Sequence, residues 1–336
     1  MKVLMIGGTG IISTAVSDLL PAQGHELWLL NRGTRPGLVP AGVHCLQADI
    51  GDEAGVASLL DGYRFDSVVD WMVFTPDQAA RDIRLFSGKT EQYVFISSGS
   101  AYQRPSRNHI VTEETPLENP FSAYARDKAS CEAALMDAYR QTGFPVTIVR
   151  PSLTYGDLVI PYVLNSWNKP WTLIDRMRRG KKIIVPGDGT SLWELTHNSD
   201  FAKGITGLLG RSDVLGEAFH ITSGEVMTWE EILRQIADAA GLEAKVEHVS
   251  SEFICAFMPQ EEGSLMGDKI SSVIYDNRKI KRFVPGYEAT VPFREGIRRT
   301  LQFMMQHPER CVIDTEHDEK MDEILAAHEY GMGLAK

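Results

Sequence analysis

Short apolar segments alternate with amphipathic segments along the first 150 residues of the chain. The apolar segments have the length and the turn-bounded ends of buried strands, and the segments between them repeat apolar residues at helical spacing. Strands that alternate with helices in this way build a parallel sheet with helices on both faces. The pattern therefore predicts an α/β fold with a doubly wound parallel sheet. Its strands are expected at 2–6, 26–30, 43–46, 67–71, 91–96 and 145–149, and its helices at 15–20, 53–60, 77–86 and 124–139.

The pattern changes after residues 1–156, which we predict to form the first domain. Loops rich in Pro, Trp and Gly then separate shorter helices, and residues 157–306 are expected to form mainly a smaller second domain. One strand near 217–222 is expected to return to the main sheet, and a well-patterned helix is predicted at 229–240. Residues 307–336 predict a charged helical extension in which nothing indicates chemistry.

Size and composition favour a globular protein with a substantial core, because 43 % of the 336 residues are hydrophobic. No apolar run approaches the roughly 20 residues of a membrane span, and the chain starts with a strand pattern, so we expect a cytoplasmic protein with no membrane contact. The cysteines are far apart and form no C-x-x-C motif, which favours reduced thiols and predicts no metal site. They are Cys45, Cys131, Cys255 and Cys311.

The charge balance is acidic, with a formal net charge of −11. Such a charge repels nucleic acid and anionic membranes unless a basic patch compensates for it, so a nucleic-acid partner is not expected. Basic residues cluster at Arg176 to Lys182 and at Asn277 to Arg282. We expect both clusters to be solvated faces.

A glycine-rich turn follows the first predicted strand and precedes the first predicted helix. In this context backbone N–H groups and the helix dipole point at a diphosphate, so the turn predicts a dinucleotide site. Ser13 stands where a third glycine is usual. The alternative is a plain turn. The candidate cofactor-binding residues here are Gly7, Thr9, Gly10, Ile11 and Ile12.

The second predicted strand ends in Asn31-Arg32-Gly33, where an acidic residue would favour NAD. An arginine at this point can pair with the 2′-phosphate of NADP, so Asn31 and Arg32 favour NADP slightly over NAD. The alternative is that Arg32 and Arg35 are exposed loop charges. After the third strand, Asp49 and Ile50 are placed to meet the adenine.

Tyr124 and Lys128 lie four residues apart at the start of a predicted helix, so they share one helix face. We expect the Lys128 ammonium to lower the pKa of the Tyr124 phenol, which makes Tyr124 a proton donor and acceptor near neutral pH. The alternative is a surface helix that carries such a pair by chance. Ser98 ends a central strand, at the edge where ligands bind in open α/β sheets.

These motifs, in this order, resemble an extended short-chain dehydrogenase/reductase of the NAD(P)-dependent epimerase/dehydratase type, to about Gln306. The resemblance implies a Rossmann-like domain at 1–156, a substrate-binding domain at 157–306 and a homodimer. It implies that Tyr124 is the acid/base, that Lys128 binds ribose and lowers the pKa of Tyr124, and that Ser98 polarises the reacting oxygen. Pro151 and Ser152 are further expected cofactor contacts. The matching motifs are Gly7 to Gly10, Ser97-Ser98 with Tyr102, Tyr124 with Lys128, Arg150-Pro151 with Tyr155-Gly156, Gly187 to Gly189 with His197 and Asp200, and Glu295 to Ile297.

The chain departs from the family pattern at the expected substrate site. Sugar 4,6-dehydratases have Asp-Glu after the catalytic hydroxyl, whereas Gly99 and Ser100 stand there, so dehydration is not expected. Nucleotide-sugar epimerases clamp the substrate diphosphate with two arginines, and here those places hold Trp193 and Leu265. A sugar nucleotide is thus not supported. Ser100 and Trp193 are the candidate substrate contacts.

Two functions follow. The first is an NAD(P)-dependent oxidoreductase or epimerase that acts on a hydroxyl or carbonyl of a small substrate, with a sugar-like ring as one candidate. The alternative is a non-redox protein that binds the cofactor for regulation or associates with RNA. Chloroplast stem-loop-binding proteins are similar in the Gly-Gly-Thr-Gly start, the Asn-Arg-Gly segment and the missing clamps. An RNA-binding member would need a basic surface and salt-sensitive binding.

Overall fold

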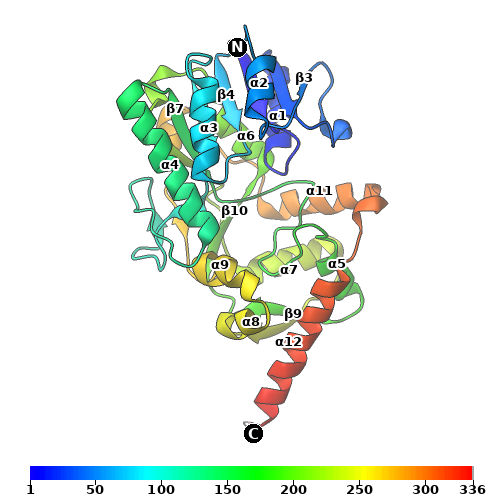
Figure 1. The fold of residues 1–336 in the computed structure, drawn as a ribbon. Coiled ribbons are helices and arrows are strands. Elements are labelled where there is room, and N and C mark those ends of the chain that lie inside the picture. The colour runs from blue at the N-terminus through cyan, green and yellow to red at the C-terminus, as the bar shows by residue number, and fades with distance from the viewer. Residues whose placement is uncertain (335–336) are drawn as a thin grey trace.

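A seven-stranded parallel sheet forms the upper part of the molecule in a computed structural model that describes residues 1–334 (Figure 1). The strand order is β11-β7-β5-β4-β1-β2-β3. The chain runs from β1 outward to one edge and then restarts at β4 towards the other, so a crevice opens at the carboxyl ends of β1 and β4. The predicted doubly wound α/β fold is therefore confirmed. The strands are β1 (Lys2–Ile6), β2 (Glu26–Asn31), β3 (His44–Gln47), β4 (Ser67–Asp70), β5 (Tyr93–Ile96), β7 (Val146–Pro151) and β11 (Ala218–Ile221).

Helices cover both faces of this sheet because the strands are apolar on both sides. In β1, Val3 and Met5 pack into one core, whereas Leu4 and Ile6 pack into the core on the opposite face. The first core includes α1 (Ser13–Ala22) and α6 (Asn198–Thr206). The second includes α2 (Glu53–Leu59), α3 (Pro76–Phe86) and α4 (Ala123–Thr142).

The lower part of the molecule is built from small sheets and helices around a third core (Figure 1). Segment 157–306 is shared between the two parts, because α6, β11 and α10 (Arg278–Phe283) pack on the main sheet. The predicted domain boundaries at residues 156 and 306 therefore stay a proposal. The small strands are β6 (Ile110–Val111), β8 (Leu153–Tyr155), β9 (Lys182–Pro186), β10 (Leu192–His197), β12 (Val226–Thr228), β13 (Lys245–Val249) and β14 (Ile274–Tyr275), and the remaining helices are α5 (Thr172–Arg178), α7 (Trp229–Ala240), α8 (Ser251–Phe257), α9 (Glu262–Ser264), α11 (Phe293–Gln306) and α12 (Thr315–Leu334).

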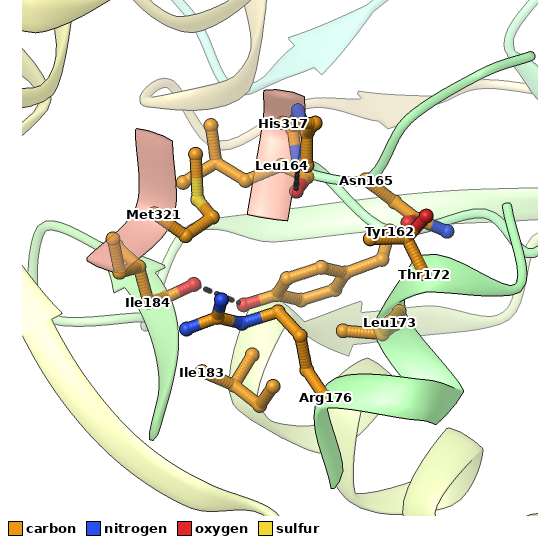
Figure 2. A pocket seen from close by; sticks show the side chains of 10 residues that line it. All are labelled: Tyr162, Leu164, Asn165, Thr172, Leu173, Arg176, Ile183, Ile184, His317 and Met321. Atoms are coloured by element: carbon orange, nitrogen blue, oxygen red, sulfur yellow. Dashed lines mark hydrogen bonds between the residues drawn. The ribbon is translucent and has the colours of Figure 1, made fainter. Parts of the chain in front are cut away.

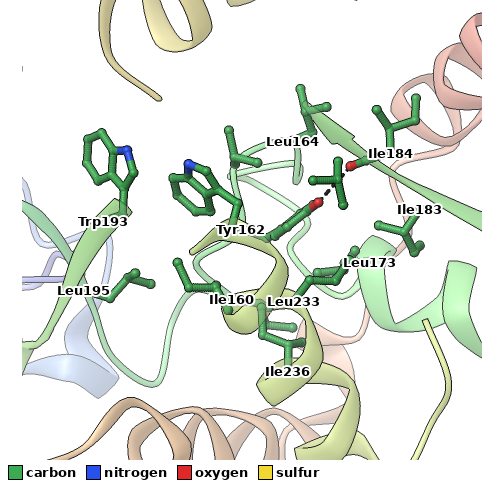
Figure 3. Close-up of a cluster of buried hydrophobic side chains, with 14 of the residues drawn as sticks. Ile160, Tyr162, Leu164, Leu173, Ile183, Ile184, Trp193, Leu195, Leu233 and Ile236 are labelled. Carbon is green, nitrogen blue, oxygen red and sulfur yellow. Dashed lines mark hydrogen bonds between the residues drawn. The ribbon is translucent and has the colours of Figure 1, made fainter. Parts of the chain in front are cut away.

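The third core packs around α7, which begins with a capping box in which Thr228 and Glu231 bond each other's backbone N–H groups. Figure 3 shows Leu233 and Ile236 of this helix beside Tyr162, with Trp193 at the edge of the cluster. The Tyr162 hydroxyl donates to the Ile184 carbonyl at 2.7 Å, so its polar end is satisfied inside the core.

The C-terminal helix α12 docks against the lower part through ion pairs and extends away from the body at its end (Figure 1). The Arg176 guanidinium lies 2.6 Å from an Asp318 carboxylate oxygen and 3.0 Å from Asp322. The cluster from Arg176 to Lys182 is thus not the solvated face that we expected, since Arg176 is only 3 % exposed and Lys181 and Lys182 also pair with α12. Residues 335 and 336 of the predicted extension lie outside the described residues.

A small cavity remains where α12 meets the body (Figure 2). Figure 2 shows His317 and Met321 of α12 on one side of it and Tyr162 and Arg176 on the other. It encloses about 10 Å³, which is room for one water molecule at most. We therefore regard it as a packing gap and not as a ligand site.

Residues 1–334 contain neither a membrane-spanning helix nor a cluster of metal-ligating side chains. None of the helices there combines the length and the apolarity needed to cross a membrane. Within the same residues, no group of three or more His, Cys, Asp or Glu side chains could hold a metal ion. All four cysteines carry free thiols.

Candidate active site

A cleft of about 670 Å³ opens at the carboxyl edge of the main sheet, where the strand order reverses. All the expected cofactor-binding residues except Ser152 line it. The cleft is lined by the turn Gly7 to Ser13, by Asn31, Arg32, Thr34 and Arg35, by Ala48 to Gly51, by Trp71, Met72 and Phe74, by Gln78 and Arg81, and by Ile96, Ser97, Tyr124, Lys128 and Pro151.

The glycine turn is shaped by its backbone angles. Gly7 and Gly8 have φ values of +101° and +92°, which side chains larger than hydrogen rarely allow. A Cβ atom on Gly8 would also approach Leu29 to 2.6 Å. The Gly10 N–H donates to the Ser13 hydroxyl at 2.9 Å, so Ser13 is a side-chain acceptor within the turn, where a third glycine is usual.

Two arginines lie in the loop after β2, at one end of the cleft. Arg32 is exposed, and the Arg35 guanidinium donates to the Thr9 carbonyl at 3.1 Å. The Asn31 side chain accepts from the Gly33 N–H at 2.9 Å and fixes the turn between them. The loop thus presents two guanidinium groups beside the glycine turn, and sequence reasoning treated Arg35 only as a loop charge.

Lys128 lies at the bottom of the cleft and is 2 % exposed. Its ammonium donates to the carbonyls of Val73 at 2.6 Å and Ile96 at 2.7 Å, which leaves one of its three N–H groups free for a ligand. Burial lowers the pKa of Lys128 to about 8, against the opposing charges of Cys131 and Asp70.

Tyr124 lies in the first turn of α4, where the Ser122 hydroxyl caps the helix by accepting from the Ala125 N–H at 3.2 Å. Desolvation raises the pKa of Tyr124, and a hydrogen bond with the Ser98 side chain partly offsets this shift. The net shift of the Tyr124 pKa is therefore upward. The Lys128 ammonium lies 5.7 Å from the Tyr124 ring centroid, and the expected lowering of this pKa by Lys128 stays a prediction.

A second pocket of about 550 Å³ lies on the other side of Tyr124. It is lined by Ser100 of the segment after β5, by Phe121 to Tyr124, by Trp167, and by Pro259, Gln260, Glu262 to Ser264, Asp268 and Lys269. Tyr124 is the one residue that lines both the cleft and the second pocket. It therefore stands where a ligand in the cleft and a ligand in the pocket would meet.

Residues 3–222 match the NAD dependent epimerase/dehydratase family, and this match covers well over half of the chain. The chain belongs to this family. The cleft and Tyr124 therefore lie at the sheet edge of an NAD dependent epimerase/dehydratase fold.

Individual members of the family are distant in sequence. The chain is 24 % identical to the 2′-dehydrokanamycin reductase of Streptomyces kanamyceticus over 86 % of this chain and 80 % of that protein. It is 26 % identical to the chloroplast stem-loop binding protein of 41 kDa b of Arabidopsis thaliana over 74 % of this chain, but it spans only 65 % of that protein. Among solved structures, a UDP-glucose 4-epimerase of Thermotoga maritima superposes with a TM-score of 0.74 at 18 % identity, covering 92 % of this chain and all of that one.

One feature of the cleft, independent of the comparisons, suits the dinucleotide of this family. Ser97 is 2 % exposed, lines the cleft, and its hydroxyl has no hydrogen-bond partner among the described residues. A buried hydroxyl without a partner is costly, which suits a site that a polar ligand completes. The sequence places Ser97 in the Ser97-Ser98 motif but gives no sign that its hydroxyl faces the cleft without a partner.

The structure contradicts two of the expected ligand contacts, one to the cofactor and one to the substrate. Ser152 does not line the cleft, because its hydroxyl turns to β10 and lies 3.3 Å from the Thr196 hydroxyl. Trp193 does not line the second pocket, because it is 1 % exposed and its ring packs 5.6 Å from that of Trp229. Leu265 is fully buried as well. The two positions at which nucleotide-sugar epimerases are expected to carry clamping arginines therefore hold buried side chains, Trp193 and Leu265.

Gly99, which stands where a dehydratase is expected to carry an acidic residue, lies in a crowded position. A Cβ atom there would lie 2.3 Å from the Tyr275 hydroxyl oxygen and 3.2 Å from the Pro151 carbonyl oxygen. The acidic residue that a dehydratase carries at this place would not fit beside Tyr275.

A buried polar network stands behind the second pocket, centred on Asp268. Its carboxylate accepts from Ser100 at 2.9 Å, from Arg104 at 3.1 Å and from Lys269 at 2.5 Å. Burial alone would raise the pKa of Asp268, but the charges of Lys269 and Arg104 hold it below its usual range. Asp268 is therefore ionised, and both cations are already neutralised.

Proposed function

We propose that the protein is an NAD(P)-dependent oxidoreductase or epimerase that acts on a hydroxyl or carbonyl group of a small substrate. The observation that carries this proposal is the position of Tyr124 between the cleft and the second pocket, with the Lys128 ammonium 5.7 Å from its ring centroid and the Ser98 side chain near enough to lower its pKa. An acid/base group at such a junction can reach the reacting oxygen of one ligand beside the other.

Each of the three residues has a distinct role in this proposal. A bound nicotinamide supplies or accepts a hydride. The Tyr124 hydroxyl gives a proton to the carbonyl oxygen in reduction and takes it from the alcohol in oxidation. Ser98 donates a hydrogen bond to the same oxygen and polarises it. Lys128 would use its remaining N–H group to hold a ribose hydroxyl, and its charge would lower the pKa of Tyr124.

The cofactor is proposed to be NADP in preference to NAD. Arg32 and Arg35 are two cations at the end of β2, where a 2′-phosphate would lie, and a guanidinium can bind a phosphate through two hydrogen bonds. We expect NADPH to bind more tightly than NADH. Replacing Arg32 by Ser should weaken NADPH about tenfold, the loss of one charge-assisted contact, and leave NADH nearly unchanged. Equal affinity of the wild-type protein for both cofactors would overturn the preference.

Reduction of a ketone is the first reaction to test. The 2′-dehydrokanamycin reductase aligns with most of this chain, and reduction needs no residue beyond Ser98, Tyr124 and Lys128. Epimerisation of a nucleotide sugar is the less favoured form of the proposal, because both clamp positions are buried and apolar. Dehydration is not proposed, because the acidic residue expected of a dehydratase is replaced by Gly99, where a side chain would crowd the Tyr275 hydroxyl.

The test is the Tyr124→Phe variant. It removes the proton-transferring hydroxyl and keeps the ring, so turnover of a ketone panel should fall by about 10²- to 10⁴-fold. NADPH affinity, measured by fluorescence titration, should change by less than about twofold. The control is Tyr330→Phe on the exposed end of α12, which should behave as wild type. Undiminished turnover in Tyr124→Phe would sink the assigned mechanism.

A second candidate is a non-redox regulatory or RNA-associated protein, favoured by the alignment with the chloroplast stem-loop binding protein. The net charge of −11 argues against a nucleic-acid partner. This candidate predicts tight cofactor binding, a silent substrate panel and RNA binding that weakens steeply with salt. The proposed enzyme predicts turnover and no RNA binding at 50 mM salt. Either form would be a homodimer, which analytical ultracentrifugation can test.

A further inference from the structure

The second pocket offers no free positive charge. Lys269 is the cation that lines it, and its ammonium is bound to Asp268 at 2.5 Å and lies 4.2 Å from the centre of the Trp193 ring. Arg104 behind the pocket is 2 % exposed and also bonded to Asp268. A diphosphate needs unpaired guanidinium or ammonium groups, so this pocket does not suit one.

One negative charge in the pocket is unpaired. Glu262 is exposed on α9, lines the pocket, and forms no ion pair with the residues that the structure describes. Its carboxylate would repel a phosphate and attract an ammonium group. The charge that this pocket presents to a ligand is thus negative.

Large aromatic surfaces surround the same pocket. Trp167 is 52 % exposed, Tyr124 44 % and Phe121 38 %, whereas the other tryptophans near this region, Trp171, Trp193 and Trp229, are buried. Exposed aromatic faces beside hydroxyl and amide groups such as those of Ser264 and Gln260 can pack on the C–H face of a ring while the polar groups bond its hydroxyls. An indole face also attracts a cation.

We infer that the second pocket binds a cyclic polyol that carries no phosphate, with its ring packed on Trp167 and an ammonium substituent paired with Glu262. The inference rests on the proposed function, since it names the substrate class that meets Tyr124. A pocket of about 550 Å³ has room for an oligosaccharide of a few rings. The substrate would be an amino-substituted carbohydrate ketone, reduced to the alcohol by hydride from the nicotinamide and a proton from Tyr124.

The experiment measures binding by calorimetry to the wild-type protein saturated with NADPH, which closes the cleft to other nucleotides. NADPH cannot reduce an alcohol, so polyol ligands bind without turnover. Three probes of similar size differ in charge: kanamycin A is cationic, maltotriose is neutral and UDP-glucose is anionic. We expect kanamycin A to bind most tightly, maltotriose at least about fivefold more weakly, as for one exposed ion pair, and UDP-glucose most weakly.

Two variants separate the contacts. Glu262→Gln should weaken kanamycin A about fivefold, to the level of maltotriose, and leave maltotriose unchanged. Trp167→Ala should weaken both ligands about tenfold, as expected for a lost aromatic contact. The matched controls are Glu91→Gln, an exposed acid before β5 at the opposite end of the sheet, and Tyr330→Ala on α12, and neither should change binding.

The outcomes distinguish this inference from the proposed function. Tighter binding of UDP-glucose than of maltotriose, weakened by Trp167→Ala, would overturn the phosphate-free assignment. An unchanged ratio of kanamycin A to maltotriose in Glu262→Gln would overturn the ammonium contact. Tight NADPH binding with no binding of any probe would overturn the carbohydrate assignment and leave the redox function standing. Failure of NADPH itself to bind would overturn the proposed function and this inference together.

Discussion

At the scale of single residues, Lys128 illustrates how a buried charge can serve both structure and binding. Its ammonium bridges the carbonyl of Val73 after β4 and that of Ile96 in β5, so it ties together the two strand ends at the bottom of the cleft. The cost of burying this charge appears in its pKa of about 8, below the ordinary 10.5. The residue is therefore about half charged at pH 8 and loses its charge as the pH rises further.

We predict that cofactor binding weakens as the pH rises through 8, because Lys128 then loses the charge that attracts the dinucleotide. Stability should move the other way, since between pH 8 and 10.5 the unfolded chain binds more protons than the folded protein and the free energy of unfolding rises with pH. The measurements are the Kd of NADPH and urea unfolding from pH 6.5 to 9.5. In Lys128→Met, neither the Kd of NADPH nor the free energy of unfolding should change through pH 8 in this way. A change that persists in the variant would belong to another titrating group.

Gly99 gives a second residue-scale prediction. Gly99→Ala should destabilise the protein by about 1–3 kcal/mol, the range for an overpacked core, because its Cβ would meet the Tyr275 hydroxyl oxygen at 2.3 Å. Tyr275→Phe removes that oxygen, so the double variant should recover much of the loss. Thermal unfolding of the wild type, the two single variants and the double variant measures the coupling between the two positions. If the losses of stability in the single variants simply add in the double variant, the steric explanation is contradicted.

At the scale of elements, α12 is held by ion pairs as well as by apolar packing, since its Met321, Ile324 and Leu325 side chains are buried in the third core. Asp318 is 6 % exposed, and burial would raise its pKa, but hydrogen bonds from Lys181, Arg176 and Arg179 hold it at about 2. This depressed pKa contributes stability above the ordinary pKa of about 4, and the contribution is lost as the pH falls from 4 to 2. The attachment of α12 should therefore be among the first features to weaken in acid.

We predict that Arg176→Met releases α12, because it leaves the Asp318 carboxylate buried with fewer partners. Removing one member of a buried ion pair costs about 3–5 kcal/mol, and the remaining contacts of Lys181 and Arg179 should reduce this. Hydrogen exchange of residues 315–333 measures the release. The control is Arg178→Met, an exposed neighbour that forms no ion pair within residues 1–334, and equal exchange in both variants would contradict this account.

At the scale of the whole molecule, the cleft joins segments from the glycine turn to Pro151, so a bound cofactor should stabilise much of the main sheet. We predict that NADPH at 100 times its Kd raises the free energy of unfolding by about 2.7 kcal/mol. Thermal unfolding with and without NADPH measures this. UDP-glucose without cofactor should give a smaller shift, and a larger one would favour a nucleotide-sugar enzyme.

Local patterns explain why the main sheet could be predicted from the sequence. Each strand is a short apolar run, and the carboxyl ends of parallel strands meet at one edge, so Gly7, Asn31 and Asp49 were expected to lie together and do line one cleft. The Thr228 cap of α7 is likewise encoded by adjacent residues.

What the sequence could not show depends on contacts between distant segments. Trp193 is buried by Trp229, and Arg176 meets Asp318 across 142 positions, so neither exposure nor pairing could be inferred from neighbouring residues. The upward pKa shift of Tyr124 depends on desolvation by the folded cleft. Motif spacing shows which groups approach each other, but not how much water they keep.

The shared wall at Tyr124 has a thermodynamic consequence. A side chain that lines both pockets would make the binding free energies of the two proposed ligands interdependent. By linkage, any factor by which the dinucleotide tightens the substrate is the factor by which the substrate tightens the dinucleotide. A substitution at position 124 should therefore alter cooperativity even where neither separate affinity changes, and the tyrosine would act as a coupling element as well as an acid.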